Sequence, residues 1–197
     1  RIPIKEKDRK LPENPYGQSK LMTEELLAFY DRLYGLKSIS LRYFNAAGAT
    51  LDGKLGENHQ PESHLIPNVV KTMLENKEFI LFGNDYPTKD GTCIRDYIHV
   101  VDLAQAHILA LEALMSGHKN NVYNLGTGKG YSNLEIIRMV EKVSNKKLKV
   151  KIAPRRSGDA NKLVADSTKI QIDLGWRPQY SDLQTIIKTA WQWHKRE

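Results

Sequence analysis

The sequence alternates between stretches with an apolar residue at every second position and stretches with apolar residues three or four positions apart. The first pattern predicts strands and the second predicts helices, so this alternation restricts the possible folds more than any other feature. Helices are expected over residues 17–34, 67–74, 103–115 and 183–193, and from residue 133 onward. Strands are expected over residues 38–46, 79–82, 97–100, 122–125 and 149–153. A helix followed by a strand suits one unit of a doubly wound parallel sheet, and the sequence therefore predicts an α/β fold.

Capping signals support several of these helix boundaries. Gly35 stands where a left-handed stop is expected after the first helix. Asp102 is expected to cap the helix over 103–115. Ser132 and Glu135 match a capping box, in which each side chain accepts a hydrogen bond from the backbone of the other. These signals place helix ends independently of the apolar pattern.

Composition restricts where the protein works. Hydrophobic residues make up 40% of the chain and charged residues 27%, as is typical of a globular protein. No apolar run approaches the roughly 20 residues that span a bilayer, and the first residues contain no apolar signal-peptide segment. Cys93 is the single cysteine, so no internal disulfide can form. The sequence therefore predicts a cytoplasmic protein in a reducing compartment, without a membrane partner.

The net charge of +7 fits a protein that binds either nucleic acid or a phosphate-bearing small molecule. The densest basic cluster comprises Lys146, Lys147, Lys149, Lys151, Arg155 and Arg156. Aromatic side chains do not interleave with this cluster, as they do on platforms that stack single-stranded bases. We therefore expect no nucleic-acid partner and interpret most of these lysines as solvated surface.

Three glycines lie between a predicted strand and a predicted helix, where a dinucleotide-binding loop would lie. They are Gly126, Gly128 and Gly130. The dinucleotide fingerprint requires its third glycine at the position of Tyr131, one residue later. The spacing therefore favours a plain glycine-rich turn over a phosphate cradle, which stays open as the alternative.

Other patterns of catalytic and metal sites are missing from the sequence. The six histidines show no H-x-x-x-H or Cys/His spacing typical of a metal site. No G-x-S-x-G elbow marks a serine hydrolase. We therefore predict no metal site.

Tyr16 and Lys20 form the strongest candidate for chemistry. Their side chains are four positions apart on the first helix and so lie on the same face. A neighbouring ammonium group stabilises the phenolate form of a tyrosine, so the pair can exchange a proton with a hydroxyl group. The spacing alone favours a solvent-facing pair, because Y-x-x-x-K is common on surface helices.

Several separate segments carry a family resemblance. NPYGQSK and LRYFNAAGA resemble the extended short-chain dehydrogenase/reductase family. GNDYPTKDGTCIRDYIHVVDLA narrows the resemblance to the UDP-glucose 4-epimerases, and PRRSGD followed by ADSTK supports it. The segments follow one another in the family's order over essentially the whole chain.

The resemblance implies a fold and a division into domains. It implies part of a Rossmann-type parallel sheet together with a smaller mixed α/β substrate-binding domain. Residues 1–47 would end the NAD-binding domain, with its front half absent from this sequence. Residues 48–197 would form mainly the UDP-sugar-binding domain, with segments around 97–130 returning to the Rossmann domain.

The resemblance also implies roles for individual residues. Tyr16 resembles the catalytic acid–base of the family, and Lys20 resembles its partner, which also hydrogen-bonds the nicotinamide ribose. Tyr43 and Phe44 match positions that contact the nicotinamide end of NAD and the substrate. Asn45 resembles the asparagine that holds the UDP diphosphate.

Further positions match the nucleotide pocket. His64 and Leu65 match a segment that lines it, in which asparagine often stands at the position of His64. Phe82 resembles an aromatic residue beside the uracil. Arg95 and Arg156 match the family's arginines on the phosphates. Asp159 matches its acidic residue on the uridine ribose.

The implied activity is the interconversion of UDP-glucose and UDP-galactose by NAD-dependent epimerisation at C4. Tyr16 would take the proton of the 4-hydroxyl as hydride passes from C4 to NAD. The 4-keto sugar would then turn while UDP stays anchored, and hydride would return to its opposite face. Leu163 occupies a position where a bulkier tyrosine resembles a gate against N-acetylated sugars, so UDP-N-acetylhexosamines are also expected substrates. The complete enzyme is expected to be a homodimer.

Two alternatives remain open. The first is another nucleotide-sugar enzyme of the same fold, a dehydratase or a decarboxylase. The second is a non-catalytic binding module, which the short run of residues before Tyr16 favours.

Overall fold

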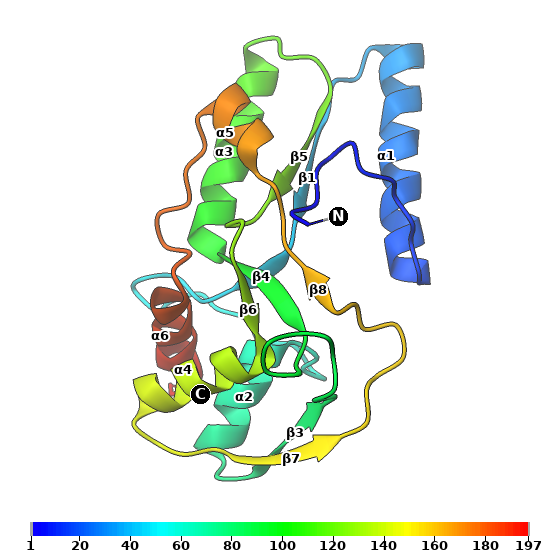
Figure 1. Cartoon of the computed structure of the whole chain (residues 1–197). Coiled ribbons are helices and arrows are strands. Elements are labelled where there is room, and N and C mark those ends of the chain that lie inside the picture. The colour runs from blue at the N-terminus through cyan, green and yellow to red at the C-terminus, as the bar shows by residue number, and fades with distance from the viewer. Residues whose placement is uncertain (1, 197) are drawn as a thin grey trace.

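The computed structural model describes residues 2–196 of the chain. In the upper half of Figure 1, β1 (Ile39–Tyr43) pairs in parallel with β5 (Asn121–Leu125). On one side of this pair lie α3 (Val100–Met115) and α5 (Thr168–Leu174), and α1 (Pro15–Tyr34) stands on the other. A buried cluster forms the core of this half: Ile98, Leu103, Ala106, Tyr123, Leu125, Ile170 and Trp176.

A short mixed sheet connects this half to the rest of the molecule. Its central strand is β4 (Ile94–His99), which pairs in parallel with β2 (Asn45–Ala47). At the other end of β4, β6 (Gly130–Ser132) pairs antiparallel and β8 (Lys162–Leu163) pairs parallel. Since only Phe44 separates β1 from β2, the chain passes directly from one sheet to the next.

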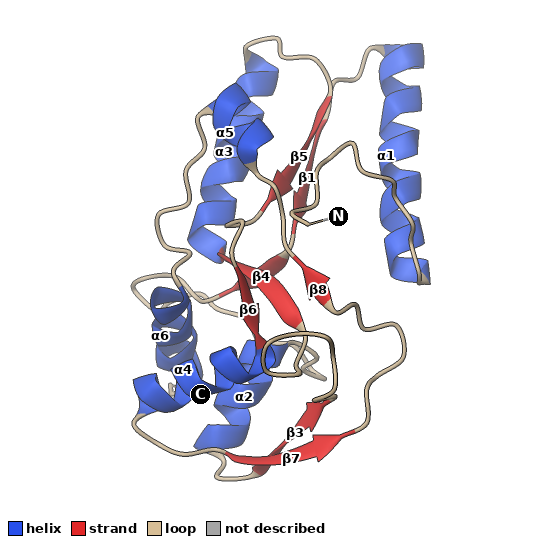
Figure 2. Cartoon of the chain, viewed as in Figure 1, coloured by secondary structure: helices blue, strands red, loops and turns tan. Residues whose placement is uncertain are grey.

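The lower half combines three helices with a two-stranded parallel sheet (Figure 2). The helices are α2 (Leu65–Leu74), α4 (Asn133–Ser144) and α6 (Leu183–His194). The strands are β3 (Glu78–Phe82) and β7 (Lys149–Ala153). A second and larger buried cluster fills this half: Ala47, Ile66, Val69, Val70, Met73, Phe79, Leu81, Tyr97, Ile136, Ile137, Val140, Leu183, Ile186, Ile187 and Ala190.

Most predicted elements are present, with ends shifted by a few residues. The capping box is confirmed, because Ser132 Oγ accepts from Glu135 N at 3.1 Å and Glu135 Oε2 accepts from Ser132 N at 2.7 Å. Gly35 follows α1 with φ of 70°, in the left-handed conformation. The sequence analysis missed β6, β8 and α5, which are too short to show a clear period.

The single strand predicted over 38–46 is wrong. The chain bends at Phe44, so that β1 pairs with β5 and β2 pairs with β4 in a different sheet. The alternating pattern continues across the bend because both strands are partly buried, and the pattern therefore carries no sign of the change of partner.

The predicted cap at Asp102 is also wrong. α3 begins at Val100, three residues earlier than predicted, and His99 caps it by accepting a hydrogen bond from Val101 N at 3.1 Å. The buried carboxylate of Asp102 instead accepts from three donors before α6: Gln179 N, Tyr180 N and Ser181 Oγ. Asp102 therefore ties the segment before α6 to the start of α3.

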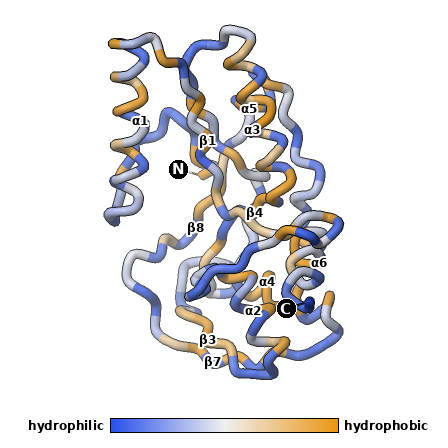
Figure 3. The backbone as a smooth tube through the Cα atoms, turned by 180° about the vertical axis from the view of Figure 1, so that it is seen from behind, coloured by the Kyte–Doolittle hydropathy of each residue, from blue (hydrophilic) through white to orange (hydrophobic). Residues whose placement is uncertain are grey.

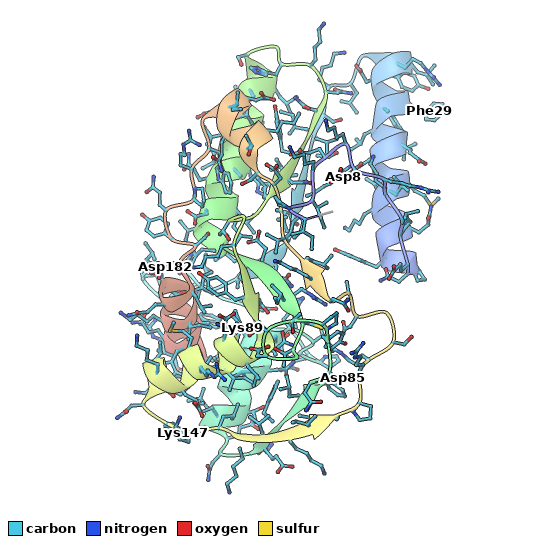
Figure 4. All side chains as sticks on the ribbon, in the orientation of Figure 1. Asp8, Phe29, Asp85, Lys89, Lys147 and Asp182 are labelled. Carbon is cyan, nitrogen blue, oxygen red and sulfur yellow. The ribbon has the colours of Figure 1, made fainter. Side chains whose placement is uncertain are left out.

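Helix α1 is the least covered helix within residues 2–196. None of its residues is buried, and the predicted apolar face with Leu26, Tyr30 and Leu33 stays exposed. Apolar positions recur along α1 in Figure 3, and Figure 4 places Phe29 on its outer side. Within residues 2–196, no helix combines the length and apolar character needed to cross a membrane.

A charged pair connects α1 to β1. Glu24 Oε2 accepts from Arg42 Nη2 at 2.5 Å, and Lys10 Nζ lies 3.1 Å from the same oxygen. The hydrogen bond from Arg42 lowers the pKa of Glu24 despite its partial burial. Contacts of this kind fix the middle of α1 relative to the end of β1.

The buried cap His99 makes stability depend on pH. Burial lowers the pKa of His99 from its ordinary value of 6.5, against the opposing charges of Asp102 and Asp182. The unfolded chain therefore binds a proton at a higher pH than the folded chain, and the stability is complete above about pH 6.5 and is lost as the pH falls. We expect urea unfolding of the wild type to shift to lower urea between about pH 7.5 and about pH 5.5.

The matched variant for this prediction is His99→Asn. Asparagine keeps an acceptor at the cap position but does not titrate. The shift of its unfolding midpoint over the same pH range should be smaller than that of the wild type. Equal shifts in the two proteins would contradict the assignment to His99.

Candidate functional site

The larger of two adjoining cavities opens where β1 ends. Its volume is about 830 Å³, and its wall combines the start of α1, the β1–β2 bend, the loop before α2 and the start of α3. Tyr16, Tyr43, Phe44 and Asn45 line it together. The carboxyl ends of parallel strands are the usual place for ligands in open α/β sheets. The structure therefore brings four of the predicted site residues into one cavity.

Tyr16 lines this cavity, and Lys20 lies beside the Tyr16 ring. Asn14 Oδ1 accepts from Gly17 N at 2.8 Å and so starts α1 just before Tyr16. The Tyr16 side chain is 72% exposed, and Lys20 Nζ lies 5.1 Å from the centre of its ring. At this distance the ammonium group of Lys20 interacts with the aromatic ring of Tyr16. The hydroxyl group of Tyr16 is accessible to a ligand in the cavity.

The smaller cavity, of about 320 Å³, lies between α2 and β3. Leu65, Phe82 and Arg156 line it. The guanidinium carbon of Arg156 is 5.2 Å from the centre of the Phe82 ring, which places a cation beside an aromatic face. Such a pocket suits a flat ring attached to an anion.

Asp159 lies between the two predicted arginines. Its Oδ2 accepts from Arg156 Nε at 3.1 Å, and its Oδ1 is 3.6 Å from Arg95 Nη2. The side chain of Arg95 is only 15% exposed and also donates to the backbone oxygen of Ala160 at 2.7 Å. Arg156, with 59% of its side chain exposed, is the arginine available to a ligand in this conformation.

Consecutive residues connect the two cavities. His64 lines the larger one and Leu65 lines the smaller one. Leu163 lies in β8 beside Arg95 and lines neither cavity. A single ligand that fills both cavities would therefore pass along the start of α2.

The glycine-rich turn serves a buried carboxylate. Asp96 Oδ1 accepts from Thr127 N at 2.9 Å, and Asp96 Oδ2 accepts from Gly128 N and Ala165 N at 3.1 Å each. Burial raises the pKa of Asp96, and these hydrogen bonds oppose the rise. Because Asp96 occupies the amide groups of the turn, they are not free to hold a phosphate, as the plain-turn interpretation predicts.

One group of polar side chains was not predicted. The loop before α2 brings together Glu57, His59, Glu62 and His64. Their spacing, E-x-H-x-x-E-x-H, differs from the H-x-x-x-H pattern sought in the sequence. Alternate histidines and carboxylates within eight residues were the signal that could have found the group.

Comparison with known proteins identifies the family. The sequence profile described as "NAD dependent epimerase/dehydratase family" matches residues 1–126. The chain belongs to this family.

Relatives in the family are similar over nearly the whole chain. The UDP-glucose 4-epimerase of Lacticaseibacillus casei is 49% identical over 195 residues, which make up 98% of this chain and 59% of the relative. That of Lactobacillus helveticus is 50% identical over 196 residues, again 59% of the relative. The chain thus spans about three fifths of the length of these relatives.

Solved structures confirm the Rossmann-type α/β fold. A UDP-glucose 4-epimerase from Brucella ovis in complex with NAD has a TM-score of 0.93 at 47% identity, covering 97% of this chain and 59% of that one. The enzyme from Bifidobacterium longum in complex with NAD⁺ and UDP has a TM-score of 0.91 at 38% identity, covering 100% of this chain and 59% of that one.

The larger cavity fits one end of NAD, the cofactor that the family name implies. Tyr43 and Tyr16 present exposed rings there, and Phe44 lines the same wall. Aromatic surface of this kind suits the nicotinamide ring. The glycine-rich turn does not fit the pyrophosphate, because Asp96 occupies its amide groups.

Proposed function

We propose that the chain carries the catalytic pair and the UDP-sugar site of an NAD-dependent UDP-glucose 4-epimerase. The observation that carries this proposal is the meeting of two cavities at His64 and Leu65, one lined by Tyr16 and one lined by Arg156. Identities of 49% and 50% to UDP-glucose 4-epimerases support it. The substrates are UDP-glucose and UDP-galactose.

In this proposal Tyr16 moves one proton. Lys20 stabilises Tyr16 as a phenolate, whose oxygen takes the proton of the sugar 4-hydroxyl. The neutral phenol that results later returns the proton to the oxygen at C4. NAD, when bound, supplies the oxidant for the carbon–hydrogen bond at C4. Tyr43 and Phe44 form part of the wall of the larger cavity and thereby hold the nicotinamide end of NAD against the sugar.

The smaller cavity holds the nucleotide. Phe82 lies beside the uracil, and Arg156 pairs with the diphosphate, as guanidinium groups do with phosphate oxygens. Asp159 accepts a hydrogen bond from the ribose, and Arg95 orients Asp159 from behind. Asn45 meets the diphosphate from the larger cavity.

The same proposal includes a division into domains and a setting. The upper half, with residues 1–47 and the segments around 97–130, continues the NAD-binding domain, and α5 belongs with it because Ile170 packs in the same core cluster. The lower half is the UDP-sugar domain. The complete enzyme works as a homodimer in the cytoplasm. The exposed apolar side chains of α1 support the presence of another protein surface that covers this helix.

Product analysis with the complete enzyme tests the proposal. UDP-galactose should be converted to UDP-glucose without added reductant or oxidant, and NAD should be released when the enzyme is denatured. A 4-keto-6-deoxy product would indicate a dehydratase, and loss of carbon dioxide from UDP-glucuronate would indicate a decarboxylase. No turnover of any UDP-sugar would favour a binding module.

Leu163 gives a prediction about substrate range. It lines neither cavity in this conformation, and its place beside the sugar rests on the family resemblance. A leucine at this position should leave room for a 2-acetamido group, so the enzyme should also act on UDP-N-acetylglucosamine. Leu163→Tyr should lower the ratio of kcat/KM for UDP-N-acetylglucosamine to that for UDP-glucose by at least about tenfold. Leu163→Met, which conserves volume, is the matched control. An unchanged ratio in the tyrosine variant would remove Leu163 from the sugar pocket.

A further inference from the structure

The loop between β2 and α2, residues 48–64, gathers four polar side chains at one point. Their donor atoms all lie within 4.8 Å of one another. His59 Nδ1 is 2.9 Å from Glu57 Oε1, and His64 Nδ1 contacts the same oxygen. Glu62 Oε1 lies 3.9 Å from His59 Nδ1 and 3.6 Å from His64 Nδ1. Two imidazole nitrogens and two carboxylates therefore converge.

These separations match a tetrahedral metal site. Zinc binds histidine nitrogen and carboxylate oxygen at about 2.0–2.2 Å, so two of its ligands in tetrahedral geometry lie about 3.4 Å apart. The separations of 2.9, 3.6 and 3.9 Å fall on both sides of that value. The contact between His64 and Glu57 is shorter, so these two donors would have to move apart to bind one ion. Small side-chain movements would bring all four donors to one ion.

Glu62 supplies an independent sign of a missing ligand. Its side chain is only 7% exposed, and within residues 2–196 its Oε2 has no hydrogen-bond partner. Burying a carboxylate oxygen without a partner is costly, so such atoms in native proteins usually meet a donor or a cation. A metal ion that Glu62 binds through both carboxylate oxygens would satisfy this atom.

The charge of the group points the same way. Among the described residues, the only ion pairs of Glu57 and Glu62 are with His59 and His64. When both imidazoles are neutral, the two carboxylates carry a charge of −2. No lysine or arginine within residues 2–196 forms an ion pair with them. A divalent cation would balance that charge.

Surrounding hydrogen bonds hold the donors in place. Trp193 Nε1 donates to the backbone oxygen of Glu57 at 2.9 Å. Glu62 Oε1 accepts from Ser63 N at 2.8 Å and His64 N at 2.9 Å, and Asn68 Nδ2 donates to the backbone oxygen of Glu62 at 3.3 Å. Partners of this kind orient the ligands of a metal site before the ion arrives.

We propose that this group binds one Zn²⁺ ion through Glu57, His59, Glu62 and His64. Two imidazoles favour zinc over magnesium or calcium, which prefer sites built from oxygen alone. Four protein ligands leave no open position, so the ion is structural. It ties the loop to the start of α2 and thereby fixes the wall of the larger cavity, which Glu57, His59 and His64 line with Tyr16. The site does not depend on the proposed epimerase activity.

Metal titration of the complete protein, without an affinity tag, tests the proposal. After treatment with a chelator, calorimetry with zinc should give one ion per chain, and Co²⁺ should give the visible absorption of tetrahedral cobalt. Zinc should also raise the Tm, since a ligand of the folded state stabilises it. Magnesium and calcium at the same concentration should neither bind at this site nor raise the Tm.

The variants are chosen so that folding does not decide the result. His59 is 58% exposed at its side chain, so His59→Gln should fold normally and weaken zinc binding by more than about 100-fold, beyond the cost of losing an outer partner. His64→Gln should act similarly. The control is His118→Gln at an exposed position near the end of α3, which should bind zinc as the wild type does. Less than one zinc per chain, or equal affinity in His59→Gln and the wild type, would overturn the proposal.

Discussion

Tyr16→Phe should lower the turnover of the complete enzyme by about 10²–10⁴-fold, the range that general acid–base groups contribute. The substitution removes only the oxygen that accepts the proton and keeps the ring that lines the larger cavity. Tyr16 is 72% exposed and buries no core surface, so the fold should not change. The loss should therefore appear in kcat.

Binding of UDP separates this role from a general disturbance of the site. Leu65, Phe82 and Arg156 line the smaller cavity without Tyr16, so the affinity for UDP should stay within about twofold of the wild type. Tyr34→Phe, on the same helix but away from both cavities, is the matched control and should keep full turnover. Near-normal turnover of Tyr16→Phe would exclude Tyr16 as the acid–base.

The pattern of the sequence predicts elements better than it predicts their partners. Ser132 and Glu135 lie three positions apart and cap α4 as expected, because a capping box depends only on local backbone. The bend at Phe44 depends on which strands lie beside β1 and β2, and no local signal carries that information. Asp102 is a good cap in isolation, but three distant donors hold its carboxylate instead.

The site follows the same division. Tyr16 and Lys20 were predicted together because four positions on a helix fix their proximity. The meeting of Arg95, Arg156 and Asp159 joins β4 to a distant loop, and only the family resemblance anticipated it. Resemblance did not anticipate that Arg95 would be engaged by the backbone of Ala160, which leaves Arg156 as the exposed cation.

Because Arg156 is exposed and Arg95 is engaged by the backbone, Arg156→Ala is the second substitution from which we expect a large effect. Arg156→Ala should weaken UDP binding to the complete enzyme by about 10–150-fold, since a hydrogen bond to a charged group contributes about 1.5–3 kcal/mol. The guanidinium group borders the smaller cavity beside Phe82, and its side chain is 59% exposed. Its removal should therefore cost affinity with little change in the free energy of unfolding. Calorimetry with UDP alone measures this without turnover.

The neighbouring arginine is the control that makes this result specific. Arg155 carries the same charge one position earlier, but its guanidinium group pairs with Asp85 at 2.6 Å and stacks 4.2 Å from the centre of the Tyr86 ring. Arg155→Ala should leave UDP affinity within about threefold, because a charge outside the cavity acts only through screened solvent. Arg95→Ala should weaken binding and also lower stability, since Arg95 orients Asp159 from a mostly buried position. Equal losses of UDP affinity in Arg155→Ala and Arg156→Ala would attribute the effect to overall charge. Unchanged UDP affinity in both Arg95→Ala and Arg156→Ala would place the diphosphate elsewhere.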